Sequence, residues 1–141
     1  MATASTLPAL KAARDKPDLS DFTLMSNVLV VLGEDEAARS KAEQAVRGQI
    51  AFYASTPSYR PVLELHGWGE LADQLNALSR RQAWTEMTAL VPDEMLETFS
   101  VSGDVARGLK DRFGDLIDRI SIYTPYDVDP ALVAAVHQEL N

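Results

Sequence analysis

Hydrophobic and polar positions alternate along the chain in patterns that predict strands and helices in turn. Residues 24–32 are dense in β-branched and apolar side chains and are followed by Gly33, which predicts a strand buried on both faces and therefore part of a parallel sheet. From Glu34 to Ala54 apolar and small residues recur every three or four positions, with charged residues opposite, which is typical of an amphipathic helix. This helix begins the crossover that a parallel strand needs.

Helical spacing continues far beyond what one crossover requires. Residues 56–58 interrupt the first helix, and leucines and other apolar residues then mark helices around 71–78 and 84–91. Pro92 opens a further helical turn, as proline does at the first position of a helix. The region of about 34–98 is therefore predicted to be almost wholly helical.

The two ends of the chain complete an alternating order. Residues 7–13 have the spacing of a helix. After the helical region, "FSVSG" predicts a short strand and "DRISIYTP" a full strand, with an amphipathic helix between them that Ser102 or Asp104 caps. Asp129 followed by Pro130 predicts the start of a last helix. This order predicts an α/β fold that is mostly helical by residue count.

Length, charge and cysteine content narrow the class of protein. A chain of 141 residues, 46% hydrophobic and 24% charged, fits a single domain over 1–141. Thirteen Lys and Arg against 21 Asp and Glu give a net charge of −8, which repels nucleic acids and anionic membranes. The absence of cysteine excludes disulfides and thiolate metal sites. Without a secretory signal or an apolar segment of about 20 residues, a cytoplasmic location is expected.

The few predicted strands raise the question of what pairs with them. Two full strands and one short strand neither close a sheet nor cover both of its faces. An edge strand exposes backbone N–H and C=O groups that another chain can pair with. The sequence therefore predicts association, either as a homodimer or with a chain that supplies the missing strands.

Several stretches resemble a known family. The sequence "IAFYASTPSYRPVLELHGW", which begins at Ile50, and the later "DRISIYTP" are similar to the C-terminal part of the luciferase-like monooxygenase superfamily. They resemble in particular its branch of coenzyme F420 (deazaflavin)-dependent oxidoreductases, and the resemblance runs from "LPAL" to "ISIYTP". It implies the C-terminal part of a (β/α)8 TIM barrel, with residues of about 34–98 as a helical insertion beside the barrel mouth.

The resemblance also implies an activity and a partner. Members of the family transfer hydride between a deazaflavin and an organic small-molecule substrate, with FMN as the alternative cofactor, and the protein positions the cofactor. The first barrel strands, which in the family carry most of the cofactor pocket, have no counterpart in this chain. We therefore expect a truncated, split or excised form that is inactive alone, with a non-catalytic oligomerising α/β module as the alternative.

Five residues are candidates for a pocket wall or lid, and none is identified as a catalyst: Tyr53, Tyr59, Arg60, His66 and Trp68. His66 could act as a base, because imidazole titrates near neutral pH, but a helix-terminal histidine beside a glycine turn is the favoured interpretation. The resemblance places the segment from Tyr53 to Arg60 near the substrate entrance, where the arginine could meet an anion. Packing between helices is the favoured role for these three.

A second candidate site would hold the phosphate of a cofactor. Ser102 and Gly103 follow a strand and precede a helix, a position where (β/α) barrels hold phosphate through backbone N–H groups. An ordinary N-cap is the favoured interpretation, and Asp104 would repel phosphate. The sequence has no Gly-rich phosphate motif and no metal-ligand cluster.

Overall fold

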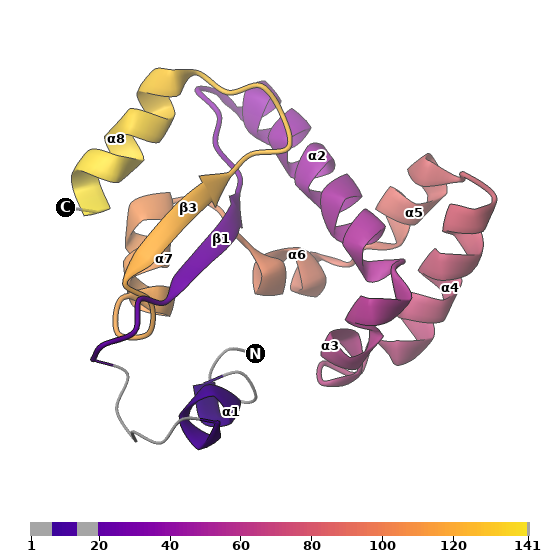
Figure 1. The fold of residues 1–141 in the computed structure, drawn as a ribbon. Coiled ribbons are helices and arrows are strands. Elements are labelled where there is room, and N and C mark those ends of the chain that lie inside the picture. Colours follow the sequence, from indigo (N-terminus) through magenta and orange to yellow (C-terminus); the bar gives the residue numbers. More distant parts are fainter. Residues whose placement is uncertain (1–6, 14–19, 141) are drawn as a thin grey trace.

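Residues 7–13 and 20–140, which the computed structural model describes, form one small sheet and a larger set of helices (Figure 1). The predicted elements are present and close to their predicted positions. In chain order they are α1 (Leu7–Ala12), β1 (Met25–Val30), α2 (Glu36–Ala54), the 3₁₀ turn η2 (Pro57–Tyr59), α3 (Arg60–Glu64), α4 (Gly69–Arg80), α5 (Trp84–Leu90), α6 (Asp93–Phe99), β2 (Ser100–Val101), α7 (Val105–Phe113), β3 (Arg119–Tyr123) and α8 (Pro130–Leu140).

The sheet is parallel, as the sequence predicts, and β1 is its central strand in the order β2-β1-β3. On one side Leu29 and Val30 pair with the two residues of β2. On the other side all five residues of β3 pair with β1, from Met25 opposite Arg119 to Leu29 opposite Tyr123. The α/β class with a parallel sheet is therefore confirmed.

The strand order differs from that of a simple barrel arc. Consecutive strands of a (β/α) barrel pair in chain order with their helices on the outer face, which would place β2 between β1 and β3. Here β2 is only two residues long, and β3 pairs with the opposite edge of β1. Among the described residues no further strand pairs with β2 or β3, so both edges of the sheet are open.

One face of the sheet, which we call the covered face, packs against α7 and α8. Its strand residues are Val28, Val30, Ile120 and Ile122, and they share a core with Leu109 of α7 and with Val136 of α8. Successive residues of a strand point to opposite faces, so this set alternates along β1 and β3. The helix α7 approaches closely because residue 108 is glycine: a Cβ there would lie 2.6 Å from Val101 Cγ1.

The opposite face is covered only in part. Leu29 and Val31 pack against α2, in a core that continues into α4, α5 and α6. Toward the start of the strands the same face is exposed, and we call this part the open face; its members are Met25, Asn27, Arg119 and Ser121. The prediction of a strand buried on both faces is thus wrong for the first half of β1, because the helices reach only its second half.

Aspartate side chains cap the N-termini of three helices. The Asp35 carboxylate accepts a hydrogen bond of 2.7 Å from the Ala38 N–H and caps α2. Asp104, rather than Ser102, caps α7 by accepting from the Arg107 N–H at 3.0 Å. The predicted cap at Asp129 precedes α8, and its carboxylate accepts from the Ala131 N–H at 2.8 Å.

Candidate functional site

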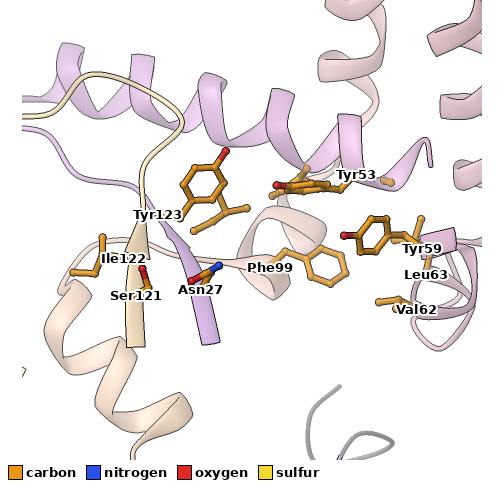
Figure 2. A pocket seen from close by; sticks show the side chains of 12 residues that line it. Asn27, Tyr53, Tyr59, Val62, Leu63, Phe99, Ser121, Ile122 and Tyr123 are labelled. Carbon is orange, nitrogen blue, oxygen red and sulfur yellow. The ribbon is translucent and has the colours of Figure 1, made fainter. Parts of the chain in front are cut away.

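A hollow of about 500 Å³ lies between the sheet and the C-terminal end of α2 (Figure 2). Apolar and aromatic side chains make up most of its surface, and we call it the aromatic hollow. Its residues are Asn27, Leu29, Ile50, Tyr53, Ala54, Tyr59, Val62, Leu63, Phe99, Ser121, Ile122 and Tyr123.

The floor of the aromatic hollow comes from neighbouring strands in register. Asn27 pairs with Ser121, and two residues further along Leu29 pairs with Tyr123. A step of two residues returns to the same face of a strand, so these four side chains share one side of the sheet. The floor therefore changes from polar to apolar and aromatic toward the carboxyl ends of β1 and β3.

The wall of the aromatic hollow is made by the end of α2 and by the turn that follows it. Pro57 begins the 3₁₀ turn η2 and stops α2, since proline cannot continue a helix. The turn brings Tyr59 back to Tyr53, with ring centroids 5.6 Å apart in a tilted arrangement that aromatic pairs prefer. In Figure 2 both rings lie on the same side of the hollow, across from Asn27 and Ser121.

Hydrogen bonds link the tyrosines of the hollow to α2. The Tyr123 hydroxyl donates to Gln49 Oε1 at 3.2 Å. Burial raises the pKa of Tyr53, and the charge and hydrogen bonding of Tyr123 raise it further. The Tyr53 phenol therefore remains neutral at physiological pH, where an unperturbed tyrosine is already protonated.

The described residues that line the hollow include no Lys, Arg, His, Asp or Glu. Two arginines lie nearby without lining it. Arg119 is two residues before Ser121 on β3, at the open end of the same face. Arg60 follows Tyr59, but Glu64, Asp73 and the Gly69 carbonyl hold its guanidinium.

The five predicted wall residues separate into two groups. Tyr53 and Tyr59 line the aromatic hollow, whereas Arg60, His66 and Trp68 do not. The ion pair of Arg60 with Asp73 connects α3 to α4, and its pair with Glu64 lies within α3, in agreement with the favoured interpretation of a role between helices. The structure thus brings the two tyrosines together and leaves the arginine outside.

His66 and Trp68 lie at a helix end, as the favoured interpretation of this segment has it. Gly67 adopts a positive φ of 78° after α3, a conformation that glycine takes without steric cost. The Trp68 N–H donates to the Leu63 carbonyl at 2.9 Å and the Gly67 N–H to the Glu64 carbonyl at 3.0 Å. This is the Schellman pattern of helix termination, which satisfies carbonyls that the helix leaves open.

An aromatic trio connects this turn to the hollow. The ring of His66 stacks on Trp68 with centroids 5.1 Å apart, and both rings meet Phe99 edge-on at 5.7 and 5.8 Å. Phe99 is itself a lining residue. His66 therefore supports the wall through Phe99 instead of contacting the hollow directly.

The predicted phosphate candidates lie elsewhere. Ser102 and Gly103 form an exposed turn after β2, and Gly103 has a positive φ of 74°. Neither residue lines the aromatic hollow. The structure does not place this turn and the aromatic hollow in one site.

Several lining residues were missed by sequence reasoning. Asn27 and Ser121 form the polar floor, Phe99 joins the wall, and Tyr123 completes the lining with a hydrogen bond to Gln49, which itself lies outside the lining set. A signal for the floor was present, because Asn27 and Ser121 are polar residues inside otherwise apolar strands. What the sequence could not show is that β3 pairs with β1, which brings these two residues together.

The family resemblance implies a deazaflavin or flavin, and the lining residues fit only part of such a cofactor. Tyrosine and phenylalanine rings over an apolar floor suit a planar ring. The anionic tail of the cofactor needs cationic or backbone N–H donors, and no described lining side chain is a cation. The hollow therefore fits the ring and leaves the tail without a partner in this part of the chain.

The described residues provide neither a metal-binding cluster nor a membrane-spanning helix. No cluster of three His, Cys, Asp or Glu side chains could hold a metal ion. No helix there has the length and apolar character required to cross a bilayer.

Comparison with known proteins adds the following findings. Residues 2–118 match the model of the luciferase-like monooxygenase family. Uncharacterized proteins of Mycobacterium bovis and of two strains of Mycobacterium tuberculosis are each 44% identical over 123 residues, which are 84% of this chain and 36% of the relative. The chain thus spans about a third of the length of these curated relatives. No solved structure matches it significantly.

Proposed function

The chain belongs to the luciferase-like monooxygenase family, and from this premise we propose that it forms part of the site of a coenzyme F420 (deazaflavin)-dependent oxidoreductase. In such a site the bound deazaflavin supplies hydride transfer to or from an organic substrate. The role of this chain is to hold a planar ring against the aromatic hollow. The observation that carries the proposal is the uncharged, tyrosine-lined hollow on the open side of the sheet.

The proposal includes a second part, which is that the chain acts as the C-terminal part of a (β/α)8 barrel and is inactive alone. It is supported by the 36% share of the relatives' length and by the open edges of β2 and β3. Chain order in a barrel requires β3 to pair with β2, so β3 would have to leave β1 when the other strands are present. A second chain, or a homodimer, would then supply strands to both edges and cationic groups to the cofactor tail.

Cofactor titration tests the first part. The purified chain is titrated with coenzyme F420 and separately with FMN, and binding is followed by cofactor fluorescence and equilibrium dialysis. We expect the deazaflavin to bind more tightly than FMN. Tyr53→Ala should weaken binding about three- to tenfold, since an aromatic contact contributes ~0.5–1.5 kcal/mol.

The matched control for this titration is Trp84→Ala. Trp84 is also a half-exposed aromatic residue, with 49% of its surface accessible, but it packs near Phe52 and does not line the hollow. Its substitution should leave cofactor binding unchanged. Tighter binding of FMN would replace the deazaflavin with the flavin in the proposal.

A non-catalytic oligomerising module is the second candidate function. The observation that favours it is the exposed apolar surface beside the open edges, where Met25 is 68% and Phe22 42% exposed. Sedimentation at several concentrations, together with the titration above, separates the two candidates. Self-association without binding of either cofactor would favour the module and contradict the cofactor proposal.

A further inference from the structure

Tyr123, which lines the aromatic hollow, has its hydroxyl proton committed to the protein. That single proton is donated to Gln49 Oε1 at 3.2 Å. A phenol oxygen whose proton is used still has lone pairs. The Tyr123 oxygen can therefore accept a hydrogen bond from a ligand in the hollow.

Charge in and around the hollow argues against an anionic ligand group. A bound anion that leaves water is compensated best by a cation, and no described lining residue carries a positive charge. Arg60 is held by Glu64 and Asp73. Arg119 is the nearest other cation along β3, and it lies outside the lining set at the exposed start of the strand.

The shape of the hollow favours a flat ligand. Tyr53, Tyr59 and Phe99 present ring surfaces, and Leu29 provides an apolar floor beneath them. Planar molecules bury more area against such rings than bulky ones do. Tyr53 and Tyr59 are 37% and 45% exposed, so the wall of the hollow is open to solvent.

We infer that the aromatic hollow binds a neutral planar ligand through a hydroxyl or N–H group that donates a hydrogen bond to the oxygen of Tyr123. The inference deepens the proposed function and rests on it only in taking the hollow as the ligand site. An aromatic alcohol substrate and the ring N–H edge of a flavin-type cofactor both have this chemistry. Tyr123 is then a specificity residue and not a catalytic one.

Three probes with one ring system test the inference. The chain is titrated with 2-naphthol, which is neutral and has a donor, with 2-methoxynaphthalene, which has none, and with 2-naphthoate, which is an anion. Binding is followed by probe fluorescence. We expect 2-naphthol to bind about three- to tenfold more tightly than its methyl ether, the range that one hydrogen bond provides, and 2-naphthoate to bind most weakly.

A single variant shows whether the Tyr123 oxygen causes this preference. Tyr123→Phe keeps the ring and removes the acceptor. Binding of 2-naphthol should fall to the level of the methyl ether, while binding of the ether stays the same. Tyr126→Phe is the matched control, because Tyr126 is a tyrosine outside the hollow whose hydroxyl bonds the backbone of β1. It should keep the preference, and circular dichroism confirms that each variant is folded.

Competition separates the two sources of ligand chemistry. Displacement of 2-naphthol by coenzyme F420 or FMN supports the inference with the cofactor ring as occupant. Retention of 2-naphthol beside a bound cofactor supports it with the organic substrate as occupant. Because the probes do not depend on the cofactor, the inference can hold even if the cofactor titration fails.

Three results would overturn the inference. Equal binding of 2-naphthol and its ether would show that no donor is recognised. Binding of 2-naphthoate as tight as that of 2-naphthol would show that an anion is accepted, and Arg119→Gln would then reveal whether Arg119 is the cause. Failure of all three probes would likewise contradict it, whatever the outcome with the cofactors.

Discussion

The two faces of the three-stranded sheet differ in how far the helices cover them. On the covered face, α7 and α8 enclose Val28 and Val30, which are 4% and 0% exposed. On the open face, Met25 is 68% exposed, and Asn27, two residues further along β1, is exposed as well. The strands are the same, so the difference lies in the helices that cover them (Figure 1).

This contrast suggests that one face of the sheet serves stability and the other serves function. A buried apolar face contributes to folding in proportion to the area it removes from water. The open face has exposed polar residues and adjoins the aromatic hollow. It therefore contributes little to folding and is available to a ligand or another chain. Substitutions on the two faces should therefore differ in the size and in the kind of their effects.

The largest effect is expected on the covered face. Leu109 of α7 is 0% exposed, and Leu109→Ala should lower the free energy of unfolding by ~2–5 kcal/mol, because it removes buried methyl groups and leaves a cavity. Urea denaturation followed by circular dichroism measures this free energy of unfolding. Leu65→Ala is the control, since Leu65 is 61% exposed, and it should change stability by less than ~0.5 kcal/mol. A loss below that level for Leu109→Ala would mean that the covered face is not a tightly packed core.

Two helix glycines should respond with opposite signs. Gly108→Ala places a Cβ 2.6 Å from Val101 Cγ1 across the covered face, so it should cost about 1–2 kcal/mol even though alanine favours the helix. Gly48→Ala in α2 places a Cβ 3.4 Å from Thr88 Oγ1, which is ordinary contact, and should stabilise by up to ~1 kcal/mol. Thermal and urea unfolding of both variants test the pair. If both stabilise the chain, α7 and β2 do not approach as closely as described.

Tyr126 joins the carboxyl end of β1 to the loop after β3 and links stability to alkaline pH. Its hydroxyl donates to the Val30 carbonyl at 2.8 Å and accepts from the Leu32 N–H at 2.7 Å. Tyr126→Phe should therefore cost ~1–2 kcal/mol at neutral pH, because two backbone groups lose their partner.

The pH dependence of this effect follows from the pKa of Tyr126. Burial raises the pKa above the ordinary value of 10.0, although the hydrogen bond from Leu32 partly opposes it. A folded-state pKa above the unfolded value gives stability that is full below pH 10 and lost as pH rises through the folded pKa. Urea midpoints of wild type and Tyr126→Phe should converge above pH 10. A constant difference between the two would show that this phenol does not titrate with unfolding.

Local features of the fold could be predicted from the sequence because each has a local cause. The run before Gly33 predicts β1, and Asp104 and Asp129 predict the starts of α7 and α8 through their capping carboxylates. The pairing of β3 with β1 could not be predicted from such signals, since it joins residues that are 94 positions apart along the chain. The family resemblance even favoured the other order.

The candidate site was predictable only where it follows a local break. The Pro57 turn drew attention to Tyr53 and Tyr59, which do line the aromatic hollow. The same reasoning included Arg60, whose ion pair with Asp73 of α4 lies across a helix contact that spacing does not reveal. Tyr123 was missed, because its position beside α2 depends on the strand order.

The smallest effect is expected on the open face. Its measurement tests whether another chain covers this face. Ser121→Val adds apolar area to an exposed strand position, so the free energy of unfolding should change by less than ~0.5 kcal/mol. Ile120→Ser, at the adjacent position on the covered face, should lower the free energy of unfolding by about 1–2 kcal/mol. Urea denaturation at several protein concentrations measures both. A gain above ~1 kcal/mol for Ser121→Val that grows with concentration would mean that another chain buries the open face, because an associated state is stabilised by mass action.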